Sequence, residues 1–338
     1  MNEIKHFLQT ISETMRYGPL YVIANNRIHS VEPLEPLENW HFWTQTKSDW
    51  LVSLMRAYPP KFMRKATLDK MIAPDHASGI QAHYDVSNDF YALFLDTQYR
   101  FYTCAEFEND GETLEAAQTH KAAYLRSLLQ LTGKEKILDL GCGWGSMMRY
   151  LQDQGHQGEL SGFTLSKEQL AYDQQQLSLD VSLTDFITTP FKASCYDRIF
   201  SIGSLEHVRP AELKQLYQKI YDALAAGGLA VHQFFSLERE AVPASMLLLQ
   251  LFFPGSLLSL HREHTEAAQS AGFSIAHDSV HDYKPTIKAW YDRLVKNQKT
   301  ALAMVDLETF NRYMTFFPVA WLFFQQQEAA LHRIVMEK

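Results

Sequence analysis

The chain has 338 residues, enough for one large domain or a domain with an appendage, and its 46% hydrophobic and 21% charged residues are an ordinary globular balance. A net charge of −8 argues against nucleic acid as the main partner, because phosphate binding favours a basic surface. The three widely spaced cysteines, Cys104, Cys142 and Cys195, argue against a disulfide framework or a metal site, and they fit a reducing cytoplasm.

The first residues lack the basic start and long apolar run of a signal peptide, so we expect no such signal there. No window reaches about 18 uninterrupted apolar residues, so we expect no transmembrane helix. We expect residues 1–75 to form a small helical N-terminal region, interrupted by several prolines. Residues 76–338 are expected to form the main domain, in which residues 237–265 and 284–325 are insertions that cover the substrate site.

Short apolar runs alternate with helical patterns through the main domain. Helices are expected over about Thr113–Leu131, Lys167–Gln176 and Ala211–Leu224. Strands are expected at Ile137–Leu140, Leu160–Thr164, Val181–Phe186, Tyr196–Ile202, Leu229–Phe235, Phe273–Ser279 and Leu331–Met336. This alternation predicts an α/β fold with a doubly wound, mostly parallel seven-stranded sheet. Ligands of such sheets bind beyond the carboxyl ends of the strands.

The first predicted strand runs directly into a glycine-rich turn, Leu138-Asp139-Leu140-Gly141-Cys142-Gly143-Trp144-Gly145, and a helical pattern follows. Such a turn brings bare backbone N–H groups and a helix N-terminus against a ligand. Its G-x-G-x-G spacing differs from the dinucleotide fingerprint, and the Gly-Lys-Ser or Gly-Lys-Thr of a phosphate-binding loop does not follow. The turn is typical of S-adenosylmethionine-dependent methyltransferases, although a ligand-free strand–helix connection would also explain it.

Polar and aromatic residues follow the next two strands. Thr164 and Gln169 occupy the place where most nucleoside-binding sheets have an acid for the ribose hydroxyls. Ser166 and Gln169 also fit a helix N-cap in a capping-box arrangement, and both interpretations can hold together. Asp185 and Phe186 suit an adenine amino group and ring face, while a surface acid beside a core aromatic explains them equally well.

Titratable groups follow the fourth strand and lie on the fifth. Glu206 and His207 are proton-handling residue types, and the alternative is a salt-bridged loop pair. His232 could face the same site or be a satisfied core histidine, and Tyr283 could reach the site or simply enter a helix. The apolar segment Pro243–Leu260 fits a buried helix–turn–helix, the lining of a lipid tunnel, or contact with a membrane surface.

Taken together, these residues resemble the cyclopropane-fatty-acyl-phospholipid synthase family, which includes the mycolic acid cyclopropane synthases. The resemblance covers roughly residues 80 to 338. Its markers are His83-Tyr84-Asp85, Tyr102-Thr103-Cys104-Ala105, the glycine-rich turn, Thr164-Leu165-Ser166-Lys167-Glu168-Gln169, Glu206-His207-Val208, His232, and Tyr283 ahead of Ala289-Trp290-Tyr291.

The resemblance implies a Rossmann-like class I methyltransferase that transfers a methyl group from S-adenosylmethionine to a cis double bond of a lipid acyl chain. It also implies a bicarbonate ion that deprotonates the resulting carbocation, giving a cyclopropane or methyl-branched product. The residues that match the bicarbonate ligands and the catalytic site are Cys104, Glu206, His232 and Tyr283, with a backbone contact near Phe234.

The expected cofactor contacts are Tyr84, Tyr102, Thr103, Asp139, Gly141, Gly143, Gly145, Thr164, Leu165, Gln169, Asp185 and Phe186. The expected partner is an unsaturated lipid acyl chain or another apolar small molecule. Peripheral contact with the inner face of a membrane and formation of a homodimer are compatible with this interpretation.

Two departures from the family pattern leave the product and the lipid head group open. Gln233-Phe234-Phe235-Ser236 follows His232, where small or β-branched residues are common in the family, and Trp321–Gln326 stands where the bacterial phospholipid enzymes carry arginines. The main alternative is an N-methyltransferase of small amines, because the benzylisoquinoline N-methyltransferases resemble the same family and carry a similar Glu-His pair. A third hypothesis is an inactive binding protein that keeps the nucleoside fold.

Overall fold

The computed structural model describes residues 19–30, 86–177, 179–238, 249, 251–253 and 256–338. Seven strands form one sheet in the order β3-β2-β1-β4-β5-β7-β6. The strands are β1 (Ile137–Leu140), β2 (Leu160–Thr164), β3 (Asp180–Leu183), β4 (Tyr196–Ile202), β5 (Leu224–Leu237), β6 (Ser274–His281) and β7 (Ala329–Glu337). The predicted doubly wound, mostly parallel seven-stranded sheet is therefore confirmed.

Strands β1 to β5 pair in parallel, whereas β7 runs antiparallel to both β5 and β6. Reversal of strand order beside β1 places the switch point between β1 and β4, where ligands of such sheets bind. Strand β5 is longer than predicted because the Gly227-Gly228 pair, expected to punctuate the chain, lies inside the strand. Strand β3 ends earlier than predicted, so Asp185 and Phe186 lie in the connection beyond it.

Helices cover both faces of the sheet. On one face, α11 (Pro210–Ala223) and α13 (His261–Ala271) pack in a core with Ile199 and Ala230. On the other face, α8 (Leu114–Leu128) and α9 (Ser146–Asp153) pack against Phe200 and Val231. Neighbouring residues of β4 and β5 thus enter opposite cores, as the two-residue period of a strand requires.

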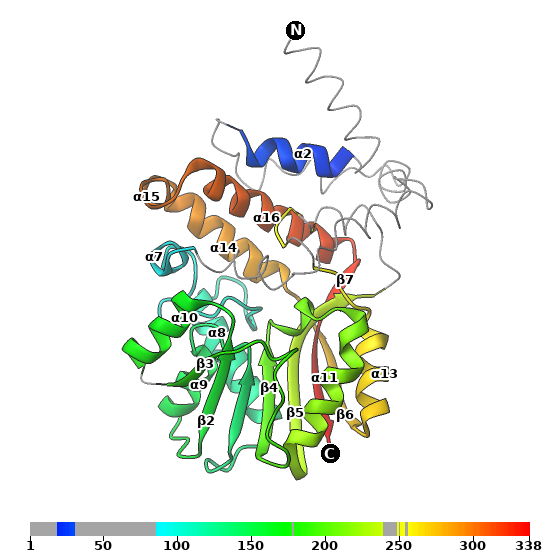
Figure 1. Cartoon of the computed structure of the whole chain (residues 1–338). Helices are drawn as coiled ribbons and strands as arrows, with labels where there is room; N and C mark the ends of the chain where they lie inside the picture. The colour runs from blue at the N-terminus through cyan, green and yellow to red at the C-terminus, as the bar shows by residue number, and fades with distance from the viewer. Residues whose placement is uncertain (1–18, 31–85, 178, 239–248, 250, 254–255) are drawn as a thin grey trace.

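A helical layer lies beyond the carboxyl ends of the parallel strands (Figure 1). It consists of α14 (Lys284–Lys296), α15 (Gln298–Met304) and α16 (Leu307–Gln325), and α2 (Pro19–Ile28) packs against α16. The remaining described helical segments are α7 (Asn88–Ala92), α10 (Lys167–Tyr172), the π-helical turn η2 (Asp173–Leu177) and the 3-10 turn η3 (Leu205–His207). The range 284–325, expected to cover the site, therefore stands over the edge of the sheet where ligands bind.

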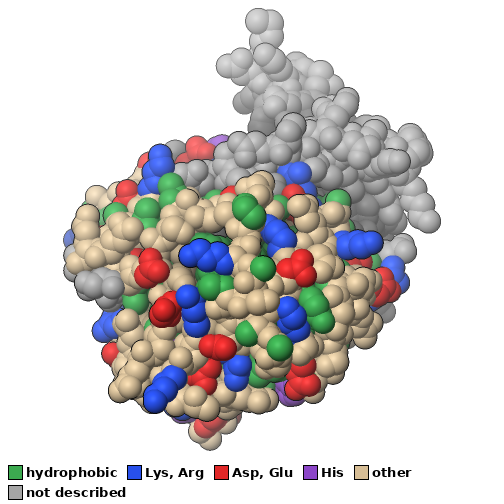
Figure 2. Space-filling model, turned by 60° about the horizontal axis from the view of Figure 1, so that its bottom comes forward, with side chains coloured by type: hydrophobic (Ala, Val, Ile, Leu, Met, Phe, Trp, Pro, Cys, Tyr) green, Lys and Arg blue, Asp and Glu red, His purple; other side chains and the backbone are tan. Residues whose placement is uncertain are grey.

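The opposite end of the molecule, at the amino ends of the parallel strands, shows acidic and basic side chains interspersed with scattered hydrophobic ones (Figure 2). Among the residues that the structure describes, no helix is long and apolar enough to cross a membrane.

Candidate active site

The glycine-rich turn has the backbone geometry that its sequence predicts. Gly141 has a φ of +87°, and a Cβ atom at this position would lie 2.5 Å from the Cβ of Ser204. Gly143 also has a positive φ, +60°, but its nearest neighbour would be Gln169 Nε2 at 3.9 Å. Gly141 is therefore required by close packing against the end of β4, whereas Gly143 leaves its backbone open to a ligand. Gly145 precedes α9 as its N-cap.

A cavity opens above this turn at the switch point of the sheet. Ten of the expected cofactor contacts line it: Tyr102, Thr103, Asp139, Gly141, Gly143, Thr164, Leu165, Gln169, Asp185 and Phe186. Gly145 is not among the lining residues, and Tyr84, with the rest of the His83-Tyr84-Asp85 marker, lies outside the described residues. Ser204 and His207 also line this cavity, although they were not among the expected cofactor contacts. Their position just after β4, at the carboxyl edge of the sheet, could have indicated it.

Asp139 is the acidic group at the end of β1. Its side chain is buried, and Oδ1 has no hydrogen-bond partner among the described residues. Burial raises the pKa of Asp139 well above its ordinary value. An orphaned carboxyl oxygen inside a ligand cavity needs a donor, and the ammonium and hydroxyl groups of S-adenosylmethionine are donors of the required kind. The residues of this cavity thus fit the cofactor that the turn predicts.

Thr164 and Gln169 form a neutral pair at the position where most nucleoside-binding sheets have an acid. The Thr164 hydroxyl donates a hydrogen bond to Gln169 Oε1 over 2.9 Å. The Ser166 hydroxyl accepts a hydrogen bond from the backbone N–H of Gln169, so the N-cap interpretation also holds. Because Oε1 is used by Thr164, the Gln169 side chain can offer its amide N–H₂ to a ligand hydroxyl.

A second, mostly aromatic cavity adjoins the first. It is lined by residues of η3, β5, α14, α16 and the segment around residues 249–258, namely Glu206, Phe235, Leu249, Phe252, Phe253, Leu258, Tyr283, Trp290, Phe316, Phe317, Phe323 and Phe324 among others. Tyr102, Gly203 and His207 line both cavities. Of the interpretations open for Pro243–Leu260, the described residues favour the lining of a cavity. The two cavities meet where a methyl group could pass from one to the other.

Glu206 is the one acidic residue among the described residues that line the aromatic cavity. It is only 6% exposed, and its Oε2 has no hydrogen-bond partner among the described residues. Burial raises the pKa of Glu206 to about 8, and no neighbouring cation lowers it. The alternative of a salt-bridged loop pair is therefore not supported. Near neutral pH, the Glu206 carboxyl group is mostly protonated and can donate a hydrogen bond.

The structure does not gather all four expected catalytic residues around one cavity. Glu206 and Tyr283 line the aromatic cavity, whereas Cys104 and His232 line neither cavity. His232 is fully buried; its Nδ1 lies 2.7 Å from the Ser201 hydroxyl, and its Nε2 has no partner among the described residues. Burial lowers the pKa of His232 to about 3, so its imidazole is neutral.

Cys104 and His232 lie on opposite faces of the sheet. The backbone carbonyl of Cys104 accepts a hydrogen bond from Gln233, which neighbours His232 on β5 and so points to the other face. The Cys104 thiol donates to backbone carbonyls of Ala105 and Asp282, and burial raises its pKa to about 12. Cys104 is therefore a protonated, hydrogen-bonded thiol behind the site.

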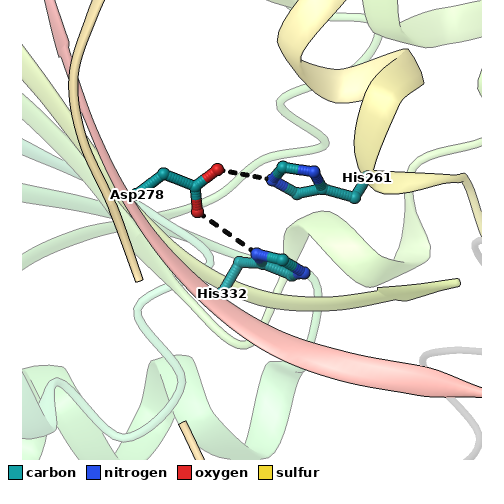
Figure 3. Close-up of side chains that lie close together, drawn as sticks. All are labelled: His261, Asp278 and His332. Carbon is teal, nitrogen blue, oxygen red and sulfur yellow. Dashed lines mark hydrogen bonds and ion pairs between the residues drawn. The ribbon is translucent and has the colours of Figure 1, made fainter. Parts of the chain in front are cut away.

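A separate polar cluster joins β6, β7 and α13 (Figure 3), and none of its three residues lines either cavity. Asp278 lies between two imidazoles, with Oδ2 at 2.8 Å from His261 Nε2 and Oδ1 at 3.2 Å from His332 Nδ1. The two rings stack with centroids 3.8 Å apart and planes 19° apart. Nearly parallel imidazole planes do not converge on one ion, because a metal lies in the plane of each ring that binds it. We therefore interpret the cluster as a set of polar contacts that join α13, β6 and β7.

Comparisons with known proteins agree with this geometry. A model of the mycolic acid cyclopropane synthetase family matches residues 73–334. A probable fatty acid methyltransferase of Pseudomonas putida is 30% identical over 276 residues, which cover 78% of this chain and 69% of that protein.

Two solved structures share the fold. The mycolic acid cyclopropane synthase CmaA1 complexed with SAH (S-adenosylhomocysteine) and CTAB is 27% identical, with a TM-score of 0.70, and the match covers 79% of this chain and 99% of that one. Coclaurine N-methyltransferase bound to N-methylheliamine and SAH has a TM-score of 0.72 over 96% of this chain and 100% of that one. At 16% sequence identity, this second likeness shows the fold alone.

Proposed function

The chain belongs to the mycolic acid cyclopropane synthetase family of S-adenosylmethionine-dependent methyltransferases, and from that membership we propose that its acceptor is a cis double bond in a lipid acyl chain. The product is a cyclopropane or a methyl-branched chain. The observation that carries the proposal is the junction of the two cavities at Tyr102, Gly203 and His207. It joins a cavity that fits the methyl donor to one whose lining suits an apolar chain.

The lining of the aromatic cavity supports the chemistry of an alkene acceptor. An alkene needs no general base when it attacks the sulfonium methyl group, but the attack leaves a carbocation. Tyr102, Trp290 and Phe324 are among the rings that line this cavity, and aromatic faces attract a cation, more strongly when water is excluded. The cavity can thus shelter the cation until a proton leaves.

Bicarbonate, which the resemblance implies, would supply the base for that proton. In this structure its direct contacts would come from Glu206 and Tyr283, which line the aromatic cavity, rather than from all four matching residues. The orphaned Oε2 of Glu206 supports this placement. Because burial keeps Glu206 protonated near neutral pH, its carboxyl group would donate a hydrogen bond to an anion instead of repelling it.

The amine alternative has less support from the cavity. An ammonium substrate would be favoured by an ionised carboxylate, yet the one acidic group among the described lining residues has its pKa raised by burial. The coclaurine N-methyltransferase likeness extends only to the fold. Aromatic rings alone could still attract an ammonium ion, so the experiment includes an amine acceptor.

The test is methyl transfer from labelled S-adenosylmethionine by the purified full chain. Three acceptors are compared: vesicles of a phospholipid with cis-unsaturated chains, vesicles of its saturated counterpart, and a soluble benzylisoquinoline amine. We expect label in the unsaturated lipid and none in the saturated one. Label in the amine with none in either lipid would contradict the proposal.

A further inference from the structure

A fully buried arginine lies behind the site. Arg333, on β7, is 0% exposed and donates hydrogen bonds from Nη1 to Glu106 and from Nε to Gln233 Oε1, the latter over 2.8 Å. Its Nη2 has no hydrogen-bond partner among the described residues, and the guanidinium lies over the Tyr124 ring, 5.1 Å from its centroid. A buried guanidinium loses its hydration, which costs free energy. Because one donor group of Arg333 stays without a hydrogen bond, the bonds to Glu106 and Gln233 do not fully offset that cost. Fold stability alone is therefore a poor explanation for this residue.

Gln233 connects Arg333 to the edge of both cavities. It faces Arg333 across the β5–β7 ladder, and its Nε2 donates to the backbone carbonyl of Cys104 over 3.4 Å. The backbone carbonyl of Gln233 accepts a hydrogen bond of 2.8 Å from Gly203, which lines both cavities. The Gln233 side chain thus joins β7 to the segment that contains Cys104, and the Gln233 backbone contacts Gly203 at the junction of the cavities.

Glu106 connects Arg333 to the segment that carries Tyr283. Glu106 Oε2 lies 2.8 Å from Nδ1 of His281, and the same His281 nitrogen lies 3.2 Å from Arg333 Nη1. Burial raises the pKa of Glu106, but the hydrogen bond from His281 and the charge of Arg333 together hold it below its usual value. Two residues further on, Tyr283 lines the aromatic cavity.

The network therefore reaches two segments whose side chains meet the substrates. The first is residues 102–106, whose members Tyr102 and Thr103 line the cofactor cavity. The second is residues 281–283. The two segments also touch directly, because the Cys104 thiol donates to the Asp282 carbonyl over 3.6 Å. Arg333 on β7 and Gln233 on β5 thus contact both segments, and β7 itself lines the cavities only at Ala329.

We propose that Arg333 and Gln233 are positioning residues for methyl transfer, which set the placement of residues 102–106 and 281–283 at the junction of the two cavities. The identity of the acceptor in this proposal rests on the proposed function. The contacts that position the two segments do not depend on it. Misplacing a substrate-facing segment by about 1 Å lowers turnover by up to about 100-fold while most binding contacts persist. A positioning role therefore predicts a loss in kcat with little change in binding.

The first test uses Gln233→Leu in the full chain, which keeps the side-chain size and removes both side-chain hydrogen bonds. We expect kcat to fall by about 10- to 100-fold. The KM of the acceptor and the Kd of S-adenosylmethionine are expected to stay within about threefold of their wild-type values, because the other cavity contacts remain. Hydrogen exchange of peptides covering residues 102–106 and 281–283 should become faster, with no acceptor present.

Asp278→Asn is the matched control. Asp278 contacts His332, which neighbours Arg333 on β7 and so points to the opposite face of the sheet. This variant disturbs a partly exposed polar cluster that includes His332 of β7, and it is expected to keep kcat within about twofold of the wild type, whatever stability it loses. Arg333→Lys is the second variant, because it keeps the charge beside Glu106 and cannot reproduce the guanidinium geometry.

A kcat within about twofold of wild type in both network variants would overturn the proposal. So would an equal loss of kcat in Asp278→Asn, or failure of both network variants to fold, since the residues would then be structural. Each variant is assayed with whichever acceptor the wild type methylates. A wild type that methylates only the amine would therefore contradict the proposed lipid function and leave the positioning test intact.

Discussion

The Glu206 carboxyl group is buried, and no cationic side chain among the described residues pairs with it. Its position after β4 follows from the sequence, but its burial does not, because the covering rings come from α16 and from the segment around residues 249–258. The pKa of about 8 therefore could not be predicted from neighbouring residues in the chain. That value makes Glu206 a hydrogen-bond donor at neutral pH, and it also connects protein stability to pH.

The first prediction concerns that connection. A carboxyl group whose folded pKa is raised stabilises the fold fully below its unfolded pKa of 4.5, and this contribution is lost as the pH rises to about 8. The free energy of unfolding should therefore fall between about pH 5 and about pH 9, by at most ~5 kcal/mol from this group. Glu206→Gln, neutral throughout, should lose less stability over the same interval in urea titrations. Equal losses in both proteins would refute the buried, neutral carboxyl.

The second prediction concerns bicarbonate. Removing dissolved carbon dioxide and bicarbonate from the buffer should lower the methylation rate of the wild type by about tenfold or more, and added bicarbonate should restore it. Because ionised Glu206 would repel the anion, the bicarbonate concentration needed for half-maximal rate should rise as the pH passes about 8. Glu206→Gln should show no such rise. A rate that does not depend on bicarbonate at any pH would exclude this role.

The cofactor-facing role of the glycine turn, of Thr164 and of Gln169 could be predicted from the sequence, because the local chain geometry at the ends of β1 and β2 places them at the cavity. The cavity contains ten of the twelve expected cofactor contacts for this reason. The separation of Cys104 from His232 could not be predicted, since a matching position in the chain does not reveal which face of the sheet a side chain occupies. Gln233, noted as a departure from the family pattern, has its explanation in Arg333, which lies 100 residues further along the chain.

At the scale of elements, the β1–α9 connection is where sequence and structure agree most closely. Strand β1 is wholly buried, and the turn after it needs left-handed backbone that glycine supplies at least cost. The seven strands were recognisable as apolar runs between turn residues. Strand ends were less accurate, as at β5, which begins at Leu224, ahead of the two glycines, and pairs with β4 at Leu224 and again from Leu229.

The third prediction separates the two roles of glycine in this turn. Gly141→Ala should cost about 2–4 kcal/mol of stability, because its new methyl group meets Ser204 and its φ is positive. Gly143→Ala adds strain of only about 1–2 kcal/mol, but its methyl group enters the cofactor cavity. Thermal unfolding should therefore report mainly on Gly141→Ala, and calorimetric titration with S-adenosylmethionine mainly on Gly143→Ala. The reverse pattern would show that the turn does not face the cofactor.

At the scale of the whole molecule, the aromatic cavity exists only after η3, β5, α14 and α16 come together over the sheet (Figure 1). Its lining residues span more than a hundred positions in the chain, so no local pattern could reveal its shape. The excess of aromatic residues was visible in the composition, and the structure places many of them around this cavity. Under the proposed function, the helical cover would determine which substrate meets the methyl donor.

The central claim is that this cover selects an unsaturated acyl chain. The most direct test is mass spectrometry of lipids from cells that express the wild-type chain or the Glu206→Ala variant. We predict acyl chains one methylene group heavier, formed at the expense of cis-unsaturated chains in the wild type and strongly reduced in the variant. An unchanged acyl-chain profile in cells that contain folded, cofactor-binding wild-type protein would contradict the account.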